Sequence, residues 1–99
     1  MKKHLNITVT GKVQGVYFRK YTQLEANKLG VLGTVKNQDD GSVYIEAEAE
    51  ETVLEQFVAW CHNGPEMANV SEVLVAEGDL RSFTEFMVLA DPSDYLGKV

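Results

Sequence analysis

The stretch from Gly11 to Arg19 combines residue types that together could bind an anion. It reads Gly-Lys-Val-Gln-Gly-Val-Tyr-Phe-Arg and joins an alternating segment to a helical one. Glycine adopts backbone conformations that a β-carbon forbids, so Gly11 and Gly15 would let consecutive N–H groups point toward one centre. Arg19 follows in the first turn of the expected helix, where the helix N-terminus carries a partial positive charge. A guanidinium beside a ring of amides suits a phosphate, because its planar fork donates two parallel hydrogen bonds.

The spacing of this loop differs from that of nucleotide-binding loops. A P-loop ends in Gly-Lys-Ser or Gly-Lys-Thr, whose hydroxyl holds magnesium, and the loop here has no such ending. The dinucleotide fingerprint is longer and differently spaced. Glycine-containing connections between a strand and a helix are also common without any function. Taken alone, the loop therefore leaves open both an anion site and a plain connection.

Hydrophobic periodicity predicts five strands and two helices around this loop. Leu5, Ile7 and Val9 alternate with polar residues, as on a half-buried strand. Apolar residues spaced by three and four indicate a helix capped by Gly30 and a second helix that stops at Gly64. The expected strands cover residues 4–10, 31–37, 43–49, 70–77 and 83–89, and the first expected helix covers residues 19–29. The apolar helix faces comprise Phe18, Thr22, Ala26 and Leu29 on the first, and Val53, Leu54, Phe57, Val58 and Cys61 on the second.

The order of these elements predicts the fold class. An α+β, ferredoxin-like split βαβ sandwich has this order: strand, helix, strand, strand, helix, strand, strand. We expect an antiparallel sheet of four to five strands with both helices on one face. Residues 1–90 would form the domain, and Asp91 to Val99, with a proline, a glycine and mixed charges, would form a loosely held tail.

Three side chains that could carry other chemistry are expected to be structural. His4 stands on the polar face of the first strand near a chain terminus, so it should be a surface histidine. Cys61 lies on an apolar helix face, which favours a buried thiol over a nucleophile, and one cysteine cannot form an internal disulfide. His62 has no second histidine or carboxylate spaced to share a metal. The sequence thus indicates no metal site.

Charge is distributed unevenly along the chain. The net charge is −6, yet the first 24 residues carry five basic residues and no acidic one, and the other 75 carry four basic against fifteen acidic residues. The basic segment includes Lys2, Lys3, Lys12, Arg19 and Lys20. An acidic body with a basic pocket would attract a small anion and repel polyanions such as DNA, although such unevenness also arises by chance. We expect no nucleic-acid partner.

Length and composition fit one soluble domain. The chain has 99 residues, of which 44% are hydrophobic and 24% charged. No apolar run approaches the roughly 18 residues that span a bilayer, and no hydrophobic stretch follows the first lysines. We therefore expect a cytoplasmic protein that is a monomer and does not associate with membranes.

Two segments carry a resemblance to a known family. The residues from Gly11 to Arg19 resemble the signature of the acylphosphatases, small enzymes that hydrolyse the carboxyl-phosphate bond of acyl phosphates. The segment from Gly33 to Val43 is similar to the family's second motif, a strand ending in a catalytic asparagine and followed by a turn glycine and a valine. The resemblance extends over about residues 4 to 90. It implies the same ferredoxin-like fold.

The resemblance also implies a mechanism and a set of site residues. An acyl phosphate has a carboxylate leaving group with a pKa of about 4, so neither a general acid nor a cofactor is needed. What remains is to bind the phosphoryl group and to place a water for attack. The family assigns phosphate binding to Arg19 and water positioning to Asn37, and inorganic phosphate would be both product and inhibitor. The loop residues expected to bind substrate are Gly11, Lys12, Val13, Gln14, Gly15, Val16, Tyr17 and Phe18.

The sequence departs from the family pattern at three places. Thr34 stands where members usually carry an aromatic residue, Ala49 replaces a frequent glycine, and the chain runs about nine residues past the usual end. Two other functions remain open. One is a non-catalytic ferredoxin-like binding module, and the other is an accessory domain that handles carbamoyl phosphate for a larger enzyme. The presence of both Arg19 and Asn37 distinguishes a free-standing enzyme from these two alternatives, because a pure binding module needs no amide to orient water.

Overall fold

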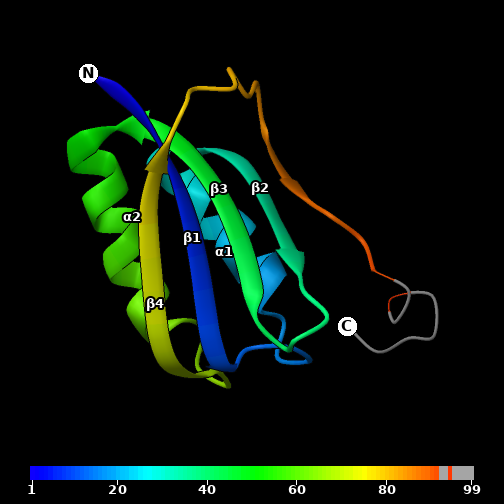
Figure 1. The fold of residues 1–99 in the computed structure, drawn as a ribbon. Helices are drawn as coiled ribbons and strands as arrows, with labels where there is room; N and C mark the ends of the chain where they lie inside the picture. The colour runs from blue at the N-terminus through cyan, green and yellow to red at the C-terminus, as the bar shows by residue number, and fades with distance from the viewer. Residues whose placement is uncertain (92–93, 95–99) are drawn as a thin grey trace.

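A computed structural model of the chain describes residues 1–91 and 94. Its elements follow the predicted order, and the ribbon shows a twisted sheet with the helices behind it (Figure 1). The strands are β1 (Lys2–Lys12), β2 (Leu32–Asn37), β3 (Val43–Glu50), β4 (Asn69–Gly78) and β5 (Phe86–Val88), and the helices are α1 (Phe18–Leu29) and α2 (Glu51–Asn63). Neither helix has the length and apolar composition that a membrane-spanning helix requires.

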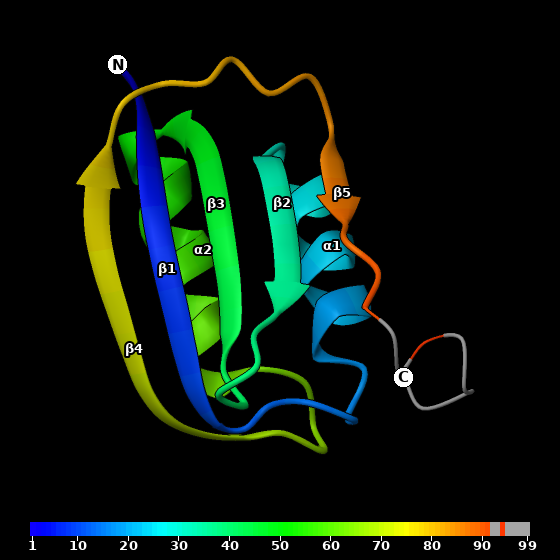
Figure 2. The same cartoon turned by 45° about the vertical axis from the view of Figure 1, so that its right-hand side comes forward.

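The sheet has the strand order β4-β1-β3-β2-β5, and both helices cover the same face of it (Figure 2). The predicted α+β ferredoxin-like fold is confirmed. The sheet is mixed, however, because β5 pairs in parallel with β2, from Gly33 beside Phe86 to Val35 beside Val88. The other three pairings are antiparallel. The parallel pair arises because the chain crosses from β4 at one edge to the opposite edge and enters there in the direction of β2 (Figure 2).

The core lies between the sheet and the two helices. Ile7 and Val9 of β1 and Ile45 of β3 are fully buried against Phe18 of α1 and Phe57 of α2. Burying a side chain of this size stabilises the fold by about 1.5–3 kcal/mol. The predicted helix faces are confirmed, since Thr22 is buried and the other residues either lie in this core or pack against it.

Gly33 interrupts the alternation of β2 for a steric reason. Its φ is 150°, and a β-carbon there would lie 1.8 Å from the carbonyl oxygen of Glu46 on β3. Only glycine permits this close approach of two neighbouring strands. The same strand continues to Asn37 with Gly33, Val35 and Asn37 on the face that the helices cover, because they pair with the buried Ala47, Ile45 and Val43.

His4 is buried, which corrects the expectation of a surface histidine. It retains only 2% of its exposed area, although it lies on the sheet face away from the helices. The connection between β4 and β5 covers it there. The ring of Phe83 stacks on the imidazole with centroids 6.1 Å apart, and the buried Glu48 accepts hydrogen bonds from the backbone N–H groups of Arg81 and Phe83.

The basic residues do not form one pocket, contrary to the expectation. Lys3 lies near the start of β1, where its Nζ atom contacts Glu51 at 3.4 Å and Glu77 at 3.8 Å. Lys12 lies at the other end of the same eleven-residue strand. Because an extended strand rises about 3.3 Å per residue, the two ends are far apart. Only the part of the basic segment from Lys12 onward lies near the glycine loop.

Candidate active site

The loop between β1 and α1 has the backbone form of an anion-binding nest. Gly15 has a φ of 73° and Tyr17 has a φ of 61°, while Val16 between them and Phe18 after them have negative φ. Alternation of right- and left-handed residues turns successive N–H groups toward one concavity. Positive φ is rare for a residue as bulky as tyrosine and costs about 1–3 kcal/mol. The surrounding fold therefore holds Tyr17 in this conformation against its own preference.

Helix α1 begins at Phe18 directly after the nest, and its N-terminus lacks a capping side chain. Tyr17 occupies the N-cap position without a side-chain hydrogen bond, and the first turn contains no acidic residue. Such an N-terminus keeps unpaired N–H donors and a partial positive charge. The nest and the helix end thus add their donors at the same place, which favours an anion.

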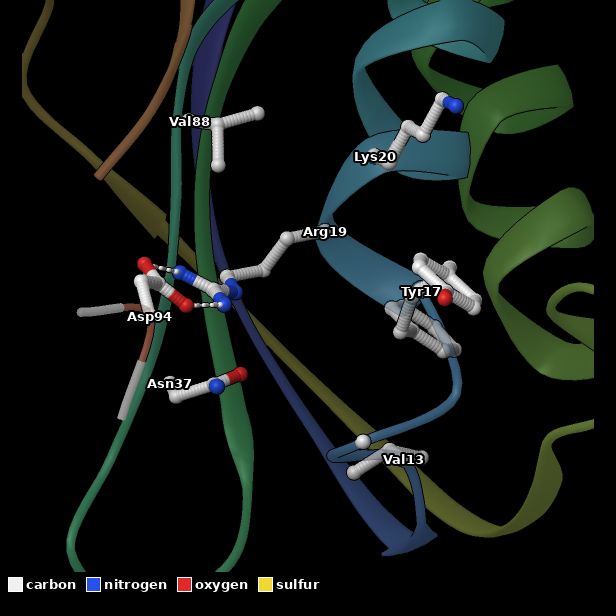
Figure 3. A pocket seen from close by; sticks show the side chains of 9 residues that line it. Val13, Tyr17, Arg19, Lys20, Asn37, Val88 and Asp94 are labelled. Carbon is white, nitrogen blue, oxygen red and sulfur yellow. Dashed lines mark hydrogen bonds and ion pairs between the residues drawn. The ribbon is translucent and has the colours of Figure 1, made fainter. Parts of the chain in front are cut away.

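Arg19 projects from the first turn of α1 toward the end of β2 (Figure 3). It is buried, with 8% of its area exposed. Its Nη1 atom donates to the carbonyl oxygen of Leu89, just after β5, at 2.9 Å. This contact fixes the guanidinium beside the sheet.

Asn37 is the last residue of β2, and its side chain lies near the guanidinium of Arg19 (Figure 3). The alternation of β2 puts it on the helix-covered face, which is the face that carries Arg19. Its Nδ2 atom donates to Oδ2 of Asp91 at 2.7 Å. Arg19 and Asn37, the two residues expected to be catalytic, are therefore brought together from different elements (Figure 3).

Gln14 ties the loop to the turn between β2 and β3. Its Nε2 atom donates to the carbonyl oxygens of Gln38 at 2.8 Å and Ser42 at 2.9 Å. That turn is itself held by the carboxylate of Asp40, which accepts from the backbone N–H and the hydroxyl of Ser42. The side chain of Gln14 thus couples the nest to the strand end that carries Asn37, a contact between two loops that sequence spacing did not reveal.

A cavity of about 240 Å³ lies between the loop, α1 and the ends of β2 and β5. Most of the residues predicted to bind substrate or to be catalytic line this cavity. Its lining consists of Val13, Gly15, Tyr17, Phe18, Arg19, Lys20, Asn37, Val88 and Asp94. Lys20 and Val88 are additions to the predicted set, and Gln14 and Val16 do not line the cavity.

Gly11 and Lys12 also lie outside the lining, because both belong to β1. They pair with Val70 and Asn69 of β4, and the register shifts between Thr10 and Gly11. A β-carbon at Gly11 would lie 2.2 Å from the carbonyl oxygen of Asn69. The glycine thus permits a β-bulge, which bends the strand before the loop begins.

Asp94 was not predicted as a site residue, yet it binds Arg19 with both carboxylate oxygens. Oδ1 accepts from Nη2 at 2.6 Å, and Oδ2 accepts from Nη1 at 3.0 Å (Figure 3). The hydrogen bonds from Arg19 and from the backbone of Asp91 lower the pKa of Asp94 to about 2. Asp91 and Asp94 belong to the segment predicted as a loose tail, and no sequence pattern marked them. The remaining residues of that segment, 92–93 and 95–99, lie outside the described residues.

Of the three departures from the family pattern, Thr34 and Ala49 lie away from the cavity, whereas Asp94 of the extra C-terminal segment lines it. Thr34 lies on the opposite face of the sheet, where its neighbours are Glu46 and Met87. Ala49 is buried near the far end of β3, beside Lys3. Residues 1–91 and 94 contain no group of three His, Cys, Asp or Glu side chains placed to hold a metal ion.

Fold and site together define a small α+β protein with a nest, a helix end and a buried arginine around one anion-sized cavity. The acylphosphatase family model matches residues 5–88. An acylphosphatase of Nocardioides sp. is 46% identical over 86 residues, which cover 84% of this chain and 87% of that one. The crystal structure of an acylphosphatase from Bacillus subtilis has a TM-score of 0.86 and 40% identity, and the match covers 91% of this chain and 100% of that one. The chain therefore belongs to the acylphosphatase family, which confirms the resemblance.

A third match concerns part of a larger protein. The crystal structure of full-length HypF in a phosphate- and nucleotide-bound form has a TM-score of 0.82 and 27% identity to this chain. The match covers 91% of this chain and 12% of that one. The same domain is thus also found as a small part of a much longer chain.

Proposed function

We propose that the chain hydrolyses the carboxyl-phosphate bond of acyl phosphates to a carboxylate and inorganic phosphate. The observation that carries this proposal is the convergence of Arg19, Asn37 and the nest on one cavity. Arg19 would hold two phosphoryl oxygens with its fork, and the N–H groups of residues 15–18 would hold the others. Membership of the family supports the reaction, and the geometry supports the assignment of residues.

The reaction needs few groups because the substrate is already activated. A water oxygen forms a bond to phosphorus while the bond from phosphorus to the carboxylate oxygen breaks, and the electron pair leaves with the carboxylate. The leaving group has a pKa of about 4 and departs without a proton. The proton of the attacking water passes to the phosphate or to solvent. Charge on the phosphoryl oxygens is stabilised by Arg19 and the nest, whose donors are already in place.

Asn37 would orient the attacking water. Its amide is neutral, so it does not repel a phosphoryl dianion as a carboxylate would, and its oxygen can accept a hydrogen bond from the water. It lies at the end of β2, a regular strand whose backbone is paired with Val43. A position on a regular strand fixes the amide more precisely than a loop would.

The loop positions divide into two kinds under this proposal. Val13, Gly15, Tyr17 and Phe18 line the cavity and would contact the substrate. Gly11, Lys12 and Gln14 would shape and hold the loop instead, and Val16 would contribute only its backbone N–H. We also propose that residues 1–90 act as a cytoplasmic, monomeric domain with phosphate as product inhibitor, and the single buried Cys61 fits such a reducing compartment.

A second candidate is a domain that acts on carbamoyl phosphate within a larger enzyme, and the match to a small part of the longer HypF chain favours the placement within a larger protein. Coverage of 87–100% of the two acylphosphatases favours the first candidate. The two differ in substrate preference. A rate on carbamoyl phosphate far above the rates on acetyl and benzoyl phosphate would favour the second.

The decisive experiment measures phosphate release from acetyl or benzoyl phosphate by the purified protein, with and without a chelator. We expect turnover well above spontaneous hydrolysis, and an equal rate in the presence of EDTA. Arg19→Ala should abolish it, while Arg81→Ala, which removes an exposed arginine, should not. Release no faster than the spontaneous rate would overturn the proposed function. Loss of activity on chelation, with recovery on adding a divalent ion, would overturn the metal-independent mechanism.

A further inference from the structure

Two carboxylates of the C-terminal segment hold the two residues that the proposed reaction needs. Asp94 binds both Nη atoms of Arg19, and Asp91 accepts from the amide of Asn37. The two acids also fix one another. The backbone N–H of Asp91 donates to Oδ2 of Asp94 at 3.0 Å, and the backbone N–H of Asp94 donates to the carbonyl oxygen of Asp91 at 3.1 Å. They therefore enter the site as one unit.

The carboxylate of Asp94 uses the donors that a phosphoryl group would use. Two parallel hydrogen bonds from the guanidinium to two oxygens on one atom are the usual geometry of arginine with either a carboxylate or a phosphate. Figure 3 shows this pair and Asn37 beside it. Because Arg19 is buried, its guanidinium has little room to turn and offer another edge.

A substrate could not bind beside these acids without a large penalty. An acyl phosphate is a dianion near neutral pH, and the carboxylate of Asp94 in the cavity and that of Asp91 on the Asn37 amide would repel it. Burial strengthens this repulsion, because screening by water is reduced. The two acids and a phosphoryl group therefore cannot occupy the site beside Arg19 and Asn37 at the same time.

We propose that Asp91 and Asp94 form an internal competitor, which must leave Arg19 and Asn37 before a phosphoryl group can bind. The inference rests on the proposed function of the same site. The apparent affinity for phosphate then equals the intrinsic affinity multiplied by the fraction of molecules whose site is open. Because the competitor acts before binding, it raises KM and the inhibition constant of phosphate by the same factor and leaves kcat unchanged.

The test compares full-length Asp94→Asn with the wild-type protein at fixed pH and ionic strength. The amide keeps the size of the carboxylate but has one acceptor oxygen in place of two, so it cannot form the two parallel hydrogen bonds with the guanidinium. Isothermal titration calorimetry measures the affinity for inorganic phosphate, and initial rates with benzoyl phosphate give KM and kcat. Asp79→Asn is the matched control, because it removes one negative charge from an exposed position on the connection between β4 and β5.

We expect Asp94→Asn to bind phosphate on the order of 5- to 10-fold more tightly, with KM lowered by the same factor, kcat unchanged and the control unaffected. The double variant Asp91→Asn/Asp94→Asn should gain at least as much. Unchanged or weaker phosphate binding in Asp94→Asn would overturn the proposal, and weaker binding with a lower kcat would make Asp94 a positioning residue for Arg19. Absence of phosphate binding in both proteins would overturn it as well.

Calorimetry separates this proposal from the proposed function. Tighter phosphate binding by Asp94→Asn, without any turnover of acyl phosphates, would support the internal competitor and overturn the enzyme. Turnover of acyl phosphates with phosphate binding that does not change in Asp94→Asn would support the enzyme and overturn the internal competitor.

Discussion

The Nδ1 atom of His4 lies 2.7 Å from Oε2 of Glu48, and both side chains are almost completely buried. The other ring nitrogen, Nε2, faces Oδ1 of Asn6 at 2.9 Å and Oε1 of Glu46 at 3.4 Å. Both ring nitrogens thus face acceptors, which favours the imidazolium. Burial opposes that charge, but the hydrogen bonds to Glu48 and Asn6 and the charges of both glutamates outweigh it and raise the pKa of His4.

This pair should make stability depend on pH. Because the pKa of His4 is raised by folding, its contribution is complete below its ordinary value of 6.5 and is lost as pH rises through the folded value. Urea unfolding of the wild-type protein and of His4→Gln at several pH values checks this. The difference in unfolding free energy should shrink from pH 6 to pH 9. The exposed His62→Gln is the control, and a difference that does not change with pH would contradict the prediction.

Glu48→Gln should destabilise the fold. The carboxylate accepts from His4, Arg81 and Phe83, and these bonds lower its pKa although burial opposes them. Its contribution is therefore present above its ordinary pKa of 4.5 and is lost as pH falls below it. Removing one partner of a buried ion pair costs about 3–5 kcal/mol. Chemical denaturation at pH 6 should show a loss of this order, whereas Glu50→Gln at an exposed site should change little.

Arg19→Ala should remove phosphate binding together with turnover, because the guanidinium would contact the phosphoryl group before and during the reaction. Arg19→Lys should also fail, since an ammonium cannot reproduce two parallel hydrogen bonds. Calorimetric titration with inorganic phosphate checks both variants. Phosphate affinity equal to that of the wild type in a folded Arg19→Ala protein would remove Arg19 from the site.

Asn37→Ala should lower kcat by a factor on the order of 10² while phosphate still inhibits. The amide would act on the attacking water, whereas the anion is held by Arg19 and the nest. Asn37→Asp should be at least as damaging near neutral pH, because the negative charge of the new carboxylate would repel the phosphoryl group. The control is Asn27→Ala on the exposed face of α1. A near-normal kcat for Asn37→Ala would exclude the water-positioning role.

The sequence predicted the placement of Arg19 and Asn37 because each depends on a local rule. The glycine loop and the start of a helix predicted Arg19 in a first helical turn, and the strand pattern predicted Asn37 where a strand meets its turn. The sheet face of Asn37 was not predicted from the sequence. The buried helix faces followed from their periodicity, which is likewise a local rule. Residues whose positions are set by their own element were therefore predicted correctly.

Residues that depend on a distant segment could not be predicted in this way. His4 was assigned to the surface because it alternates with apolar residues, yet the irregular connection around Phe83 covers it. The contacts of Asp91 and Asp94 join segments more than 50 residues apart in the sequence. The glycine at position 11 was assigned to the anion-binding loop, and its close packing against the carbonyl oxygen of Asn69 on β4 was not predicted.

The position of β1 between β3 and β4 has a consequence for how the chain folds. The first strand to be synthesised has partners that begin only at Val43 and Asn69, and it cannot complete its pairing until most of the chain exists. The entropy cost of closing such long loops must be met before the strand contacts can stabilise the chain. Folding is therefore slower than in proteins rich in local contacts. During synthesis, the apolar side of β1 therefore stays uncovered longer than the apolar side of any other strand in the sheet.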